Sequence, residues 1–197
     1  MKLSVIVPVW NQEELVLRAL NSVPVRNDIE IIVIDDNSTD GTYEEVEIYK
    51  RYSKKNIILL HSDTQLHPAG AMNWGIDVAQ GEYITQLDSD DYLETYNFNE
   101  LMNMGRTEDL IFFCNQANDG GIWNPEKIGG ICDHVCWYKR SFVGDIRMGK
   151  GKWGQGWAFH HAILAENPSK FYYDKVVYHY NYPREGSVYD LGKRGLL

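Results

Sequence analysis

Three carboxylates lie close together near the middle of the chain, at Asp88, Asp90 and Asp91, directly after the largely apolar stretch 83–87. Negative charge at this density is tolerable only beside a cation or strong hydrogen-bond donors. Because side chains alternate along a strand, Asp88 and Asp90 are predicted to face the same side and one ligand. Their hard oxygens favour Mg²⁺ or Mn²⁺. The alternative is an acidic turn that caps a helix, since Asp and Ser are common at caps.

A second acidic pair, Asp35 and Asp36, follows the apolar stretch 30–34. The residues after it, 37–41, read Asn-Ser-Thr-Asp-Gly, which indicates a tight loop leading into a helix. In open α/β sheets, ligands bind outside the carboxyl ends of the strands. Both acidic clusters are predicted to lie there, which favours a shared site over a solvated turn.

Strand and helix signals alternate through the first half of the chain and loosen after residue 93. We predict strands at 3–9, 30–35, 56–60, 81–87, 109–114, 135–138 and 175–180, and helices at 11–23, 42–52, 71–79, 98–104 and 157–165. The pattern predicts an α/β fold with a mostly parallel, doubly wound, Rossmann-like sheet and helices on both faces. A single domain, 1–197, is expected.

Composition bounds the possible partners. The chain has 197 residues, 44% of them apolar and 24% charged, which is typical of one globular domain. A formal charge of −9 makes nucleic acid an unlikely partner. No apolar run reaches the roughly 18 residues of a membrane span, and the opening residues lead directly into a strand, so a cytoplasmic protein is expected. Three cysteines, an odd number, are expected to be reduced thiols.

Five motifs follow one another in the first half of the chain. They are residues 5–11 with Glu13, 33–42, 71–75, 79–84, and Leu-Asp-Ser-Asp-Asp at 87–91. In order and spacing they resemble the family 2 glycosyltransferases of the GT-A fold. An isolated Asp-x-Asp is common by chance, whereas five motifs in register are a specific signal. The resemblance is close over about the first half of the chain.

The resemblance implies an enzyme that transfers a sugar from a nucleotide-diphosphate donor, most simply a UDP-sugar, to an acceptor hydroxyl that we expect to be on a carbohydrate. Such enzymes usually need Mn²⁺ or Mg²⁺ and invert the anomeric carbon. Asp90 is implied as the metal ligand and Asp88 as a ribose contact. Residues 1–93 would bind the nucleotide sugar and 94–197 the acceptor. The implied donor-binding residues are Pro8, Val9, Trp10, Asn11, Glu13, Asp35, Asp36, Asn73, Asp88 and Ser89.

The sequence also departs from the family pattern. The family's Ala-Arg-Asn is replaced by a stretch with Met72 in the middle, so a basic side chain near the phosphates is missing. The family's Gly-Glu-Asp-Trp, whose acidic residue acts as general base, is matched by Gly-Gln-Gly-Trp at 154–157. Because neither Gln155 nor Gly156 can take a proton, the expected base is absent from this position.

Histidines could compensate. His160 or His161, on the same predicted helix, has a side chain whose pKa suits proton abstraction near neutral pH, and His179 in the last strand could be a second metal ligand. Each could instead be an ordinary packed or surface residue. Two other readings stay open: a nucleotide-sugar-binding module with impaired catalysis, and a nucleotidyltransferase that releases pyrophosphate.

Overall fold

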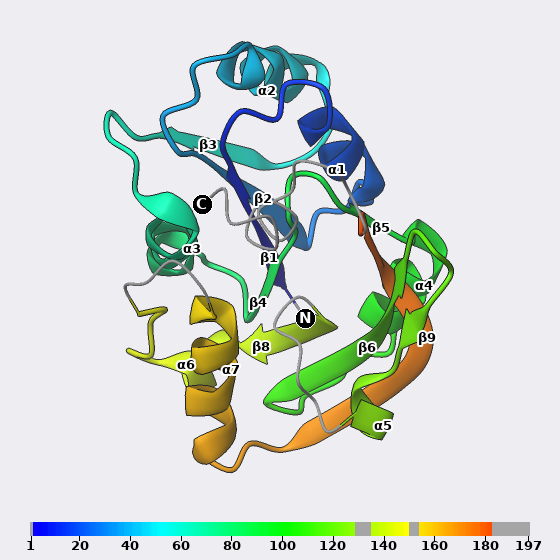
Figure 1. Cartoon of the computed structure of the whole chain (residues 1–197). Coiled ribbons are helices and arrows are strands. Elements are labelled where there is room, and N and C mark those ends of the chain that lie inside the picture. Colours follow the sequence, from blue (N-terminus) through cyan, green and yellow to red (C-terminus); the bar gives the residue numbers. More distant parts are fainter. Residues whose placement is uncertain (1, 129–134, 150–153, 183–197) are drawn as a thin grey trace.

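The structure, a computed structural model, describes residues 2–128, 135–149 and 154–182 (Figure 1). Its strands are β1 (Leu3–Val9), β2 (Ile29–Asp35), β3 (Ile57–His61), β4 (Tyr83–Gln86), β5 (Tyr92–Leu93), β6 (Leu110–Ala117), β7 (Ile122–Trp123), β8 (Cys136–Lys139) and β9 (Lys170–Tyr180). Its helices are α1 (Val16–Ser22), α2 (Thr42–Tyr52), α3 (His67–Val78), α4 (Thr95–Asn103), α5 (Pro125–Ile128), α6 (Arg140–Val143) and α7 (Gln155–Ala165). The strands make one sheet in the order β3-β2-β1-β4-β8-β6-β9-β5, with β7 beside β6.

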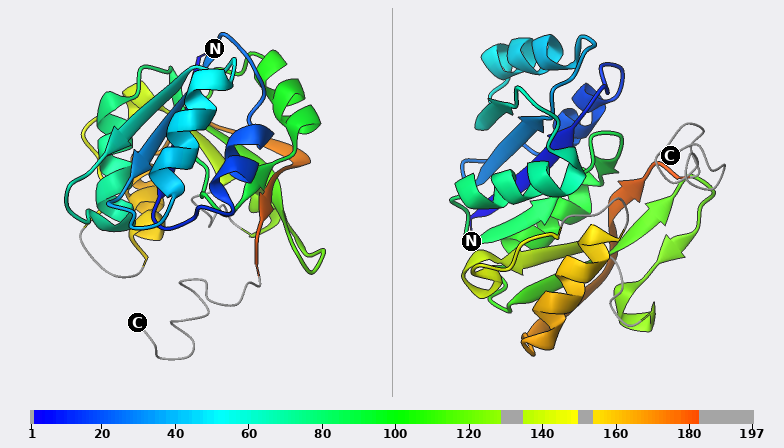
Figure 2. Two further views of the ribbon diagram at one scale, coloured as in Figure 1. Left: turned by 90° about the horizontal axis from the view of Figure 1, so that it is seen from above. Right: turned by 60° about the vertical axis from the view of Figure 1, so that its left-hand side comes forward.

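The first half of the sheet is parallel and covered on both faces. β1 pairs in parallel with β2 and β4, and β2 with β3. Alternation along β1 sends Val5 and Val7 into a core shared with α1 and α2, while Ile6 enters a second core with α3 (Figure 2). The predicted α/β, GT-A-like arrangement with helices on both faces is therefore confirmed.

The second half of the sheet is mixed. β8 runs antiparallel to both β4 and β6, whereas β9 runs parallel to β6 and antiparallel to β5. The pairing of β9 with β6 shifts register between Phe113 and Asn115, and such irregularities bend a strand. The bent β9 thus reaches β5, the edge strand that follows the acidic turn (Figure 1).

The starts of three predicted elements lie four or five residues from those in the structure. The helix after β1 begins at Val16 and not near Asn11, because the Asn11 side chain accepts a hydrogen bond from Thr39 N (2.8 Å) instead of capping the helix. α3 begins at His67, since Pro68 is compatible with a first helical turn. β9 begins at Lys170, because parallel pairing with β6 extends it beyond its apolar stretch.

Two expectations from composition can be compared with the structure. Cys114 and Cys136 are buried free thiols, as expected, while Cys132 lies outside the described residues. Within the described ranges, no helix combines the length and apolar character needed to cross a bilayer.

A buried carboxylate connects the acidic turn to the last strand. Asp91 is fully buried and accepts hydrogen bonds from the Tyr178 hydroxyl (2.5 Å) and from Asn181 N (2.7 Å). Burial, followed by the neighbouring charge of Asp88, raises the pKa of Asp91 to about 7, although both hydrogen bonds act in the opposite direction. Asp91 therefore fixes β9 to the loop after β4.

Gly75 sets how closely α3 approaches the sheet. A methyl group on Gly75 would lie 2.3 Å from Ile6 Cγ2 and 3.1 Å from Ile34 Cδ1. Both contacts are shorter than side chains normally tolerate, so the helix lies on β1 and β2 at a distance that only glycine permits.

We predict that Gly75→Ala lowers the free energy of unfolding by about 1–3 kcal/mol, because overpacking outweighs the gain in helix propensity. Urea unfolding followed by circular dichroism measures the change. Gly149→Ala is the control, since a methyl group there would meet nothing within 4 Å. An unchanged or higher stability of Gly75→Ala would contradict this packing.

We also predict that Asp91 makes stability depend on pH. Since the pKa of about 7 exceeds the ordinary 3.8, the stabilisation from the neutral carboxyl is complete below the ordinary value and is lost as pH rises through about 7. The free energy of unfolding, measured in chelator, should fall between about pH 5 and about pH 8 by less in Asp91→Asn than in the native protein.

The control for this comparison is Asp174→Asn, which alters an exposed carboxylate on the same strand and should follow the native pH profile. Parallel pH profiles for the native protein and Asp91→Asn would show that Asp91 titrates alike in the folded and unfolded chains.

Candidate functional site

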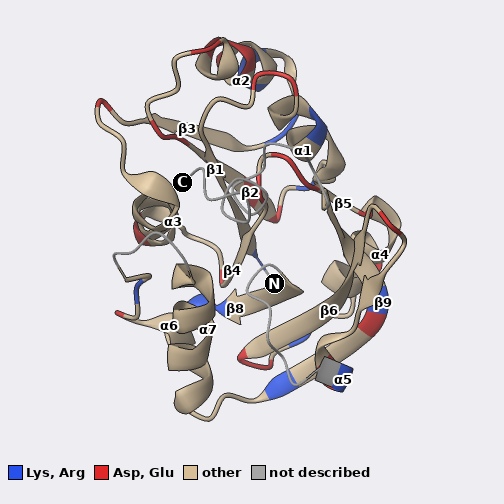
Figure 3. Cartoon of the chain, viewed as in Figure 1, with Lys and Arg blue, Asp and Glu red and all other residues tan. Residues whose placement is uncertain are grey.

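Three loops meet at the carboxyl ends of β1, β2 and β4, which are neighbours in the sheet. They are the segments 8–13, 36–41 and 87–91. Acidic segments lie along these loops in Figure 3. The expectation that the two acidic clusters share one edge of the sheet is therefore confirmed by the strand order.

The loops after β1 and β2 are fastened to each other. Asn11 N donates to Ser38 Oγ (3.0 Å), and Gly41 N donates to Glu13 Oε2 (3.0 Å). Asn11 adopts a left-handed backbone conformation with φ of 51°. Asn11 and Glu13 thus form hydrogen bonds that hold the two loops together. Trp10, in the loop after β1, is 51% exposed.

Asp35, at the end of β2, offers an unused acceptor. It is fully buried, and its Oδ2 contacts His61 Nδ1 at 2.8 Å. Its Oδ1 is also buried but has no hydrogen-bond partner among the described residues. Asp36 is engaged differently, because its Oδ1 accepts from Leu66 N (2.5 Å). A buried acceptor without a donor is costly, so this oxygen of Asp35 has the capacity to accept one more N–H or O–H group.

His61 was not predicted as a site residue. It ends β3, the strand next to β2, so the rule that ligands bind at carboxyl ends would have singled it out.

The acidic turn is held from two sides. Asp91 N donates to Asp88 O (3.0 Å), and the Asp88 side chain accepts from Gln86 Nε2 (2.6 Å). On the other side, the Arg18 guanidinium donates to Asp90 O and lies 5.1 Å from the centre of the Tyr92 ring. Arg18 therefore brings positive charge to the turn. No local motif marks it, because it lies in α1, far away in the sequence.

The protein side chains alone do not make a complete metal cage. Within the described residues, no three His, Cys, Asp or Glu side chains are grouped so that they could hold an ion. His179 is paired with Tyr92 across β5 and β9 and stacks on its ring at 4.5 Å. Burial lowers the pKa of His179, which favours the neutral imidazole that metals bind.

The residues around the expected base have different environments. His160 is 1% exposed, and its Nδ1 lies 2.8 Å from the Tyr138 hydroxyl, so it is a core residue of α7. His161 packs against the exposed Trp157 with ring centres 4.0 Å apart. Its Nε2 is buried and lacks a hydrogen-bond partner in the described part of the chain. Gln155 begins α7 and is half-buried.

Asn73 connects α3 to the segment that precedes α7. Its Nδ2 donates to Met148 O (2.9 Å) and its Oδ1 accepts from Met148 N (2.8 Å). Both ends of the amide are therefore satisfied within the protein. Residues 150–153, between this segment and α7, lie outside the described residues.

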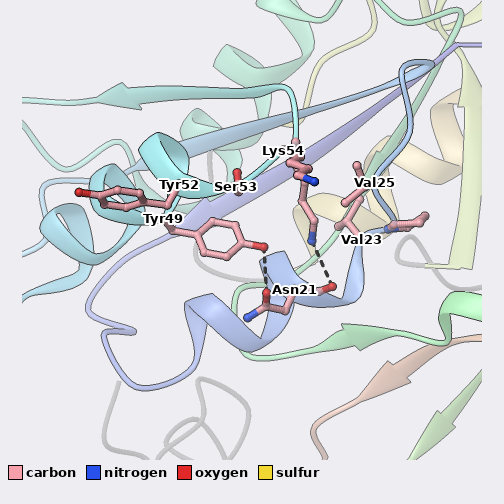
Figure 4. Close-up of a pocket in the computed structure, with 9 residues that line it drawn as sticks. Asn21, Val23, Val25, Tyr49, Tyr52, Ser53 and Lys54 are labelled. Atoms are coloured by element: carbon pink, nitrogen blue, oxygen red, sulfur yellow. Dashed lines mark hydrogen bonds between the residues drawn. The ribbon is translucent and has the colours of Figure 1, made fainter.

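A cavity of about 460 Å³ lies elsewhere, at the amino ends of β2 and β3 (Figure 4). Its walls include Asn21, Tyr49 and Lys55, and the Tyr49 hydroxyl donates to Asn21 Oδ1 (2.9 Å). Lys55 Nζ donates to Leu20 O and Asn21 O, the last carbonyls of α1, and burial lowers its pKa to about 8. These contacts cap α1 and are far from the carboxylates.

Known proteins with similar sequences are glycosyltransferases. A poly(ribitol-phosphate) beta-glucosyltransferase of Bacillus spizizenii is 34% identical over 51% of this chain and 17% of its own length. A GalNAc(5)-diNAcBac-PP-undecaprenol beta-1,3-glucosyltransferase of Campylobacter jejuni is 39% identical over 51% of this chain and 33% of its own length. The chain thus spans a third or less of these two relatives.

Solved structures share the fold over nearly the whole chain. Residues 1–349 of S. aureus TarS in complex with UDP-GlcNAc align with a TM-score of 0.82 and 25% identity, covering 95% of this chain and 60% of that one. The mannosyltransferase PcManGT from Pyrobaculum calidifontis, in complex with GDP-Man and Mn²⁺, aligns with a TM-score of 0.76 and 17% identity, covering 94% and 58%. Residues 4–166 match the model of glycosyl transferase family 2, and the chain belongs to that family.

Proposed function

We propose that this chain binds a nucleotide-diphosphate sugar at the carboxyl edge of β1, β2 and β4 and transfers the sugar to an acceptor hydroxyl with inversion. The unused, buried Oδ1 of Asp35 is the observation that carries the proposal, because it needs a donor that the described residues do not supply. A UDP-sugar is the proposed donor, in line with the UDP-GlcNAc complex of TarS. Residues 1–93 would hold this donor and 94–197 the acceptor.

Recognition of the nucleoside is assigned to the loops after β1 and β2. Asp35 Oδ1 would accept from an N–H group of the base or from a ribose hydroxyl. The half-exposed Trp10 offers a face on which the base could stack, and Pro8 and Val9 would frame it. Asp36, Asn11, Glu13 and Asn73 would act through the backbone segments that they hold. Asp88 and Ser89 would face the ribose.

The residues fit a divalent cation that is shared with the donor. Mg²⁺ and Mn²⁺ are commonly held by one or two carboxylates together with substrate phosphates, which agrees with the lack of a three-residue cage among the described side chains. Asp90 would hold the ion, and His179 is the proposed second ligand. When bound, the cation would neutralise charge on the leaving nucleoside diphosphate. Arg18, beside the Asp90 carbonyl, adds positive charge that the chain lacks at Met72.

The site lacks an evident general base to remove the proton from the acceptor hydroxyl among residues 154–161. Residues 154–161 contain no acidic side chain, and Gln155 and Gly156 occupy the position of the family's Glu-Asp pair. His160 is buried against Tyr138, which assigns it to packing, and the Nε2 of His161 is buried as well. These observations favour a second candidate function: a domain that binds the nucleotide sugar but transfers the sugar slowly.

We predict that Asp90→Asn removes the Mn²⁺-dependent part of UDP affinity while leaving the fold intact. Calorimetric titration of UDP, with Mn²⁺ and with chelator, measures this difference. Asp174→Asn is the matched control, because it deletes an exposed carboxylate on β9. If UDP bound Asp90→Asn and the native protein equally well in Mn²⁺, Asp90 would not hold the ion.

We further predict that Gln155→Glu or Gly156→Asp raises the rate of UDP release from UDP-GlcNAc without changing UDP affinity. General-base assistance typically contributes about 10²–10⁴ in rate, and water can serve as the acceptor in the assay. Ala162→Glu, an exposed position on the same helix, controls for added charge.

Two results would contradict this assignment of the base. One is fast release by the native protein that neither acidic substitution improves. The other is loss of that release in His161→Gln, which would identify His161 as the base.

A further inference from the structure

Three aromatic side chains gather where β7 meets the end of β9. They are Trp123, Tyr180 and Tyr182, and we call them the aromatic platform. The Trp123 ring lies 6.0 Å from Tyr180 and 6.5 Å from Tyr182, and the two tyrosine rings are nearly parallel at 5.6 Å. Trp123 is 39% exposed, and its neighbour Ile122 is 57% exposed.

The platform is attached to the acidic turn. Tyr180 follows Tyr178 by two residues, so both side chains leave β9 on the same face, roughly 7 Å apart. Tyr178 and Asn181 are the two residues that bind the Asp91 carboxylate. The platform therefore begins two residues along β9 from Tyr178, the residue that binds Asp91 in the acidic turn.

A second set of contacts keeps the platform in place. Asn118 N donates to Tyr182 O (2.9 Å), and Asn118 Nδ2 donates to Asn181 Oδ1 (2.8 Å). The residues around Asn181 are thus held from both β6 and the acidic turn. A preorganised surface loses less entropy when it binds a ligand.

A buried amide lies beside the platform. Asn115 is 1% exposed, and neither its Oδ1 nor its Nδ2 has a hydrogen-bond partner among the described residues. In the sheet Asn115 lies between Trp123 of β7 and Tyr178 of β9. Paired residues point to the same face, so the amide belongs to the platform's side of the sheet. Leaving a buried amide unsatisfied is costly, and this cost supports a role for Asn115 in binding.

We propose that the aromatic platform and Asn115 form the subsite that holds a neutral pyranose ring of the acceptor. The rings would pack against the apolar face of the sugar, and the amide, which both donates and accepts, would bind its hydroxyls. None of the four side chains is charged, and the nearby carboxylates disfavour an anionic saccharide. The assignment rests on the proposed glycosyl transfer, because it places the acceptor beside the donor site.

The test is saturation-transfer NMR on the full chain with cellotetraose and chitotetraose at millimolar concentration. The native protein should bind at least one of them, and Trp123→Ala should bind it about tenfold more weakly. Trp123→Phe should retain binding because it keeps an aromatic face. Tyr52→Ala removes an aromatic ring that is 85% exposed on α2 and should change nothing.

Folding and donor binding are measured in parallel. The thermal midpoint and the UDP affinity of Trp123→Ala should match the native values, because Trp123 is partly exposed and lies on β7, outside the loops assigned to the donor. If the native chain fails to bind UDP but binds the saccharide through Trp123, the proposed donor site fails while the subsite stands.

Three outcomes would overturn the subsite. The first is the absence of saccharide binding to the native protein, and the second is equal binding by Trp123→Ala. The third is a dimer of the native chain, seen by sedimentation, that Trp123→Ala dissociates. That result would assign the platform to contact between two copies of the chain.

Discussion

The site depends on the hydrogen bonds that the Asp91 side chain accepts from Tyr178 and Asn181. This side chain is buried in the turn after β4, and it binds a hydroxyl and an amide from the end of β9, about 90 residues later in the sequence. The turn that carries Asp88 and Asp90 therefore keeps its shape only when β9 has bent back across the sheet. Because Tyr180 lies between Tyr178 and Asn181, the same contacts connect the proposed donor site to the aromatic platform.

Accumulated negative charge explains the side chains that surround the acidic residues at this edge of the sheet. Asp35 has His61, Asp90 has the Arg18 guanidinium at its carbonyl, and Asp91 has the Tyr178 hydroxyl. Each partner comes from a different strand or helix, so these contacts depend on the tertiary structure. The compensation is incomplete, because one oxygen of Asp35 is left without a donor among the described residues. A site with an acceptor oxygen still unpaired favours a ligand that carries N–H and O–H groups over a ligand that is only an anion.

The first half of the fold was predictable because its parallel strands are continuous apolar runs that end in polar loops. The second half was not, since the pairing of β9 with β6 and β5 depends on a register shift and on long-range contacts that leave no local pattern. His160 shows the same limit in the site. A histidine near the expected base is attractive by type, but its burial against Tyr138 follows from packing that spacing alone does not reveal.

The motif residues divide into two groups by how their polar atoms are used. Asn73 uses both the oxygen and the nitrogen of its side-chain amide to bind the backbone of Met148, and Glu13 accepts from the backbone N–H of Gly41. A ligand would have to compete with these contacts, which shape the loops. Asp35 and Asn115, in contrast, keep buried atoms without partners in the described chain, and only Asp35 belongs to a motif. Because leaving such atoms unpaired costs stability, they mark positions where a ligand group could complete a hydrogen bond. The same criterion draws attention to Asn115, which no motif marked, as the polar group of the proposed acceptor subsite.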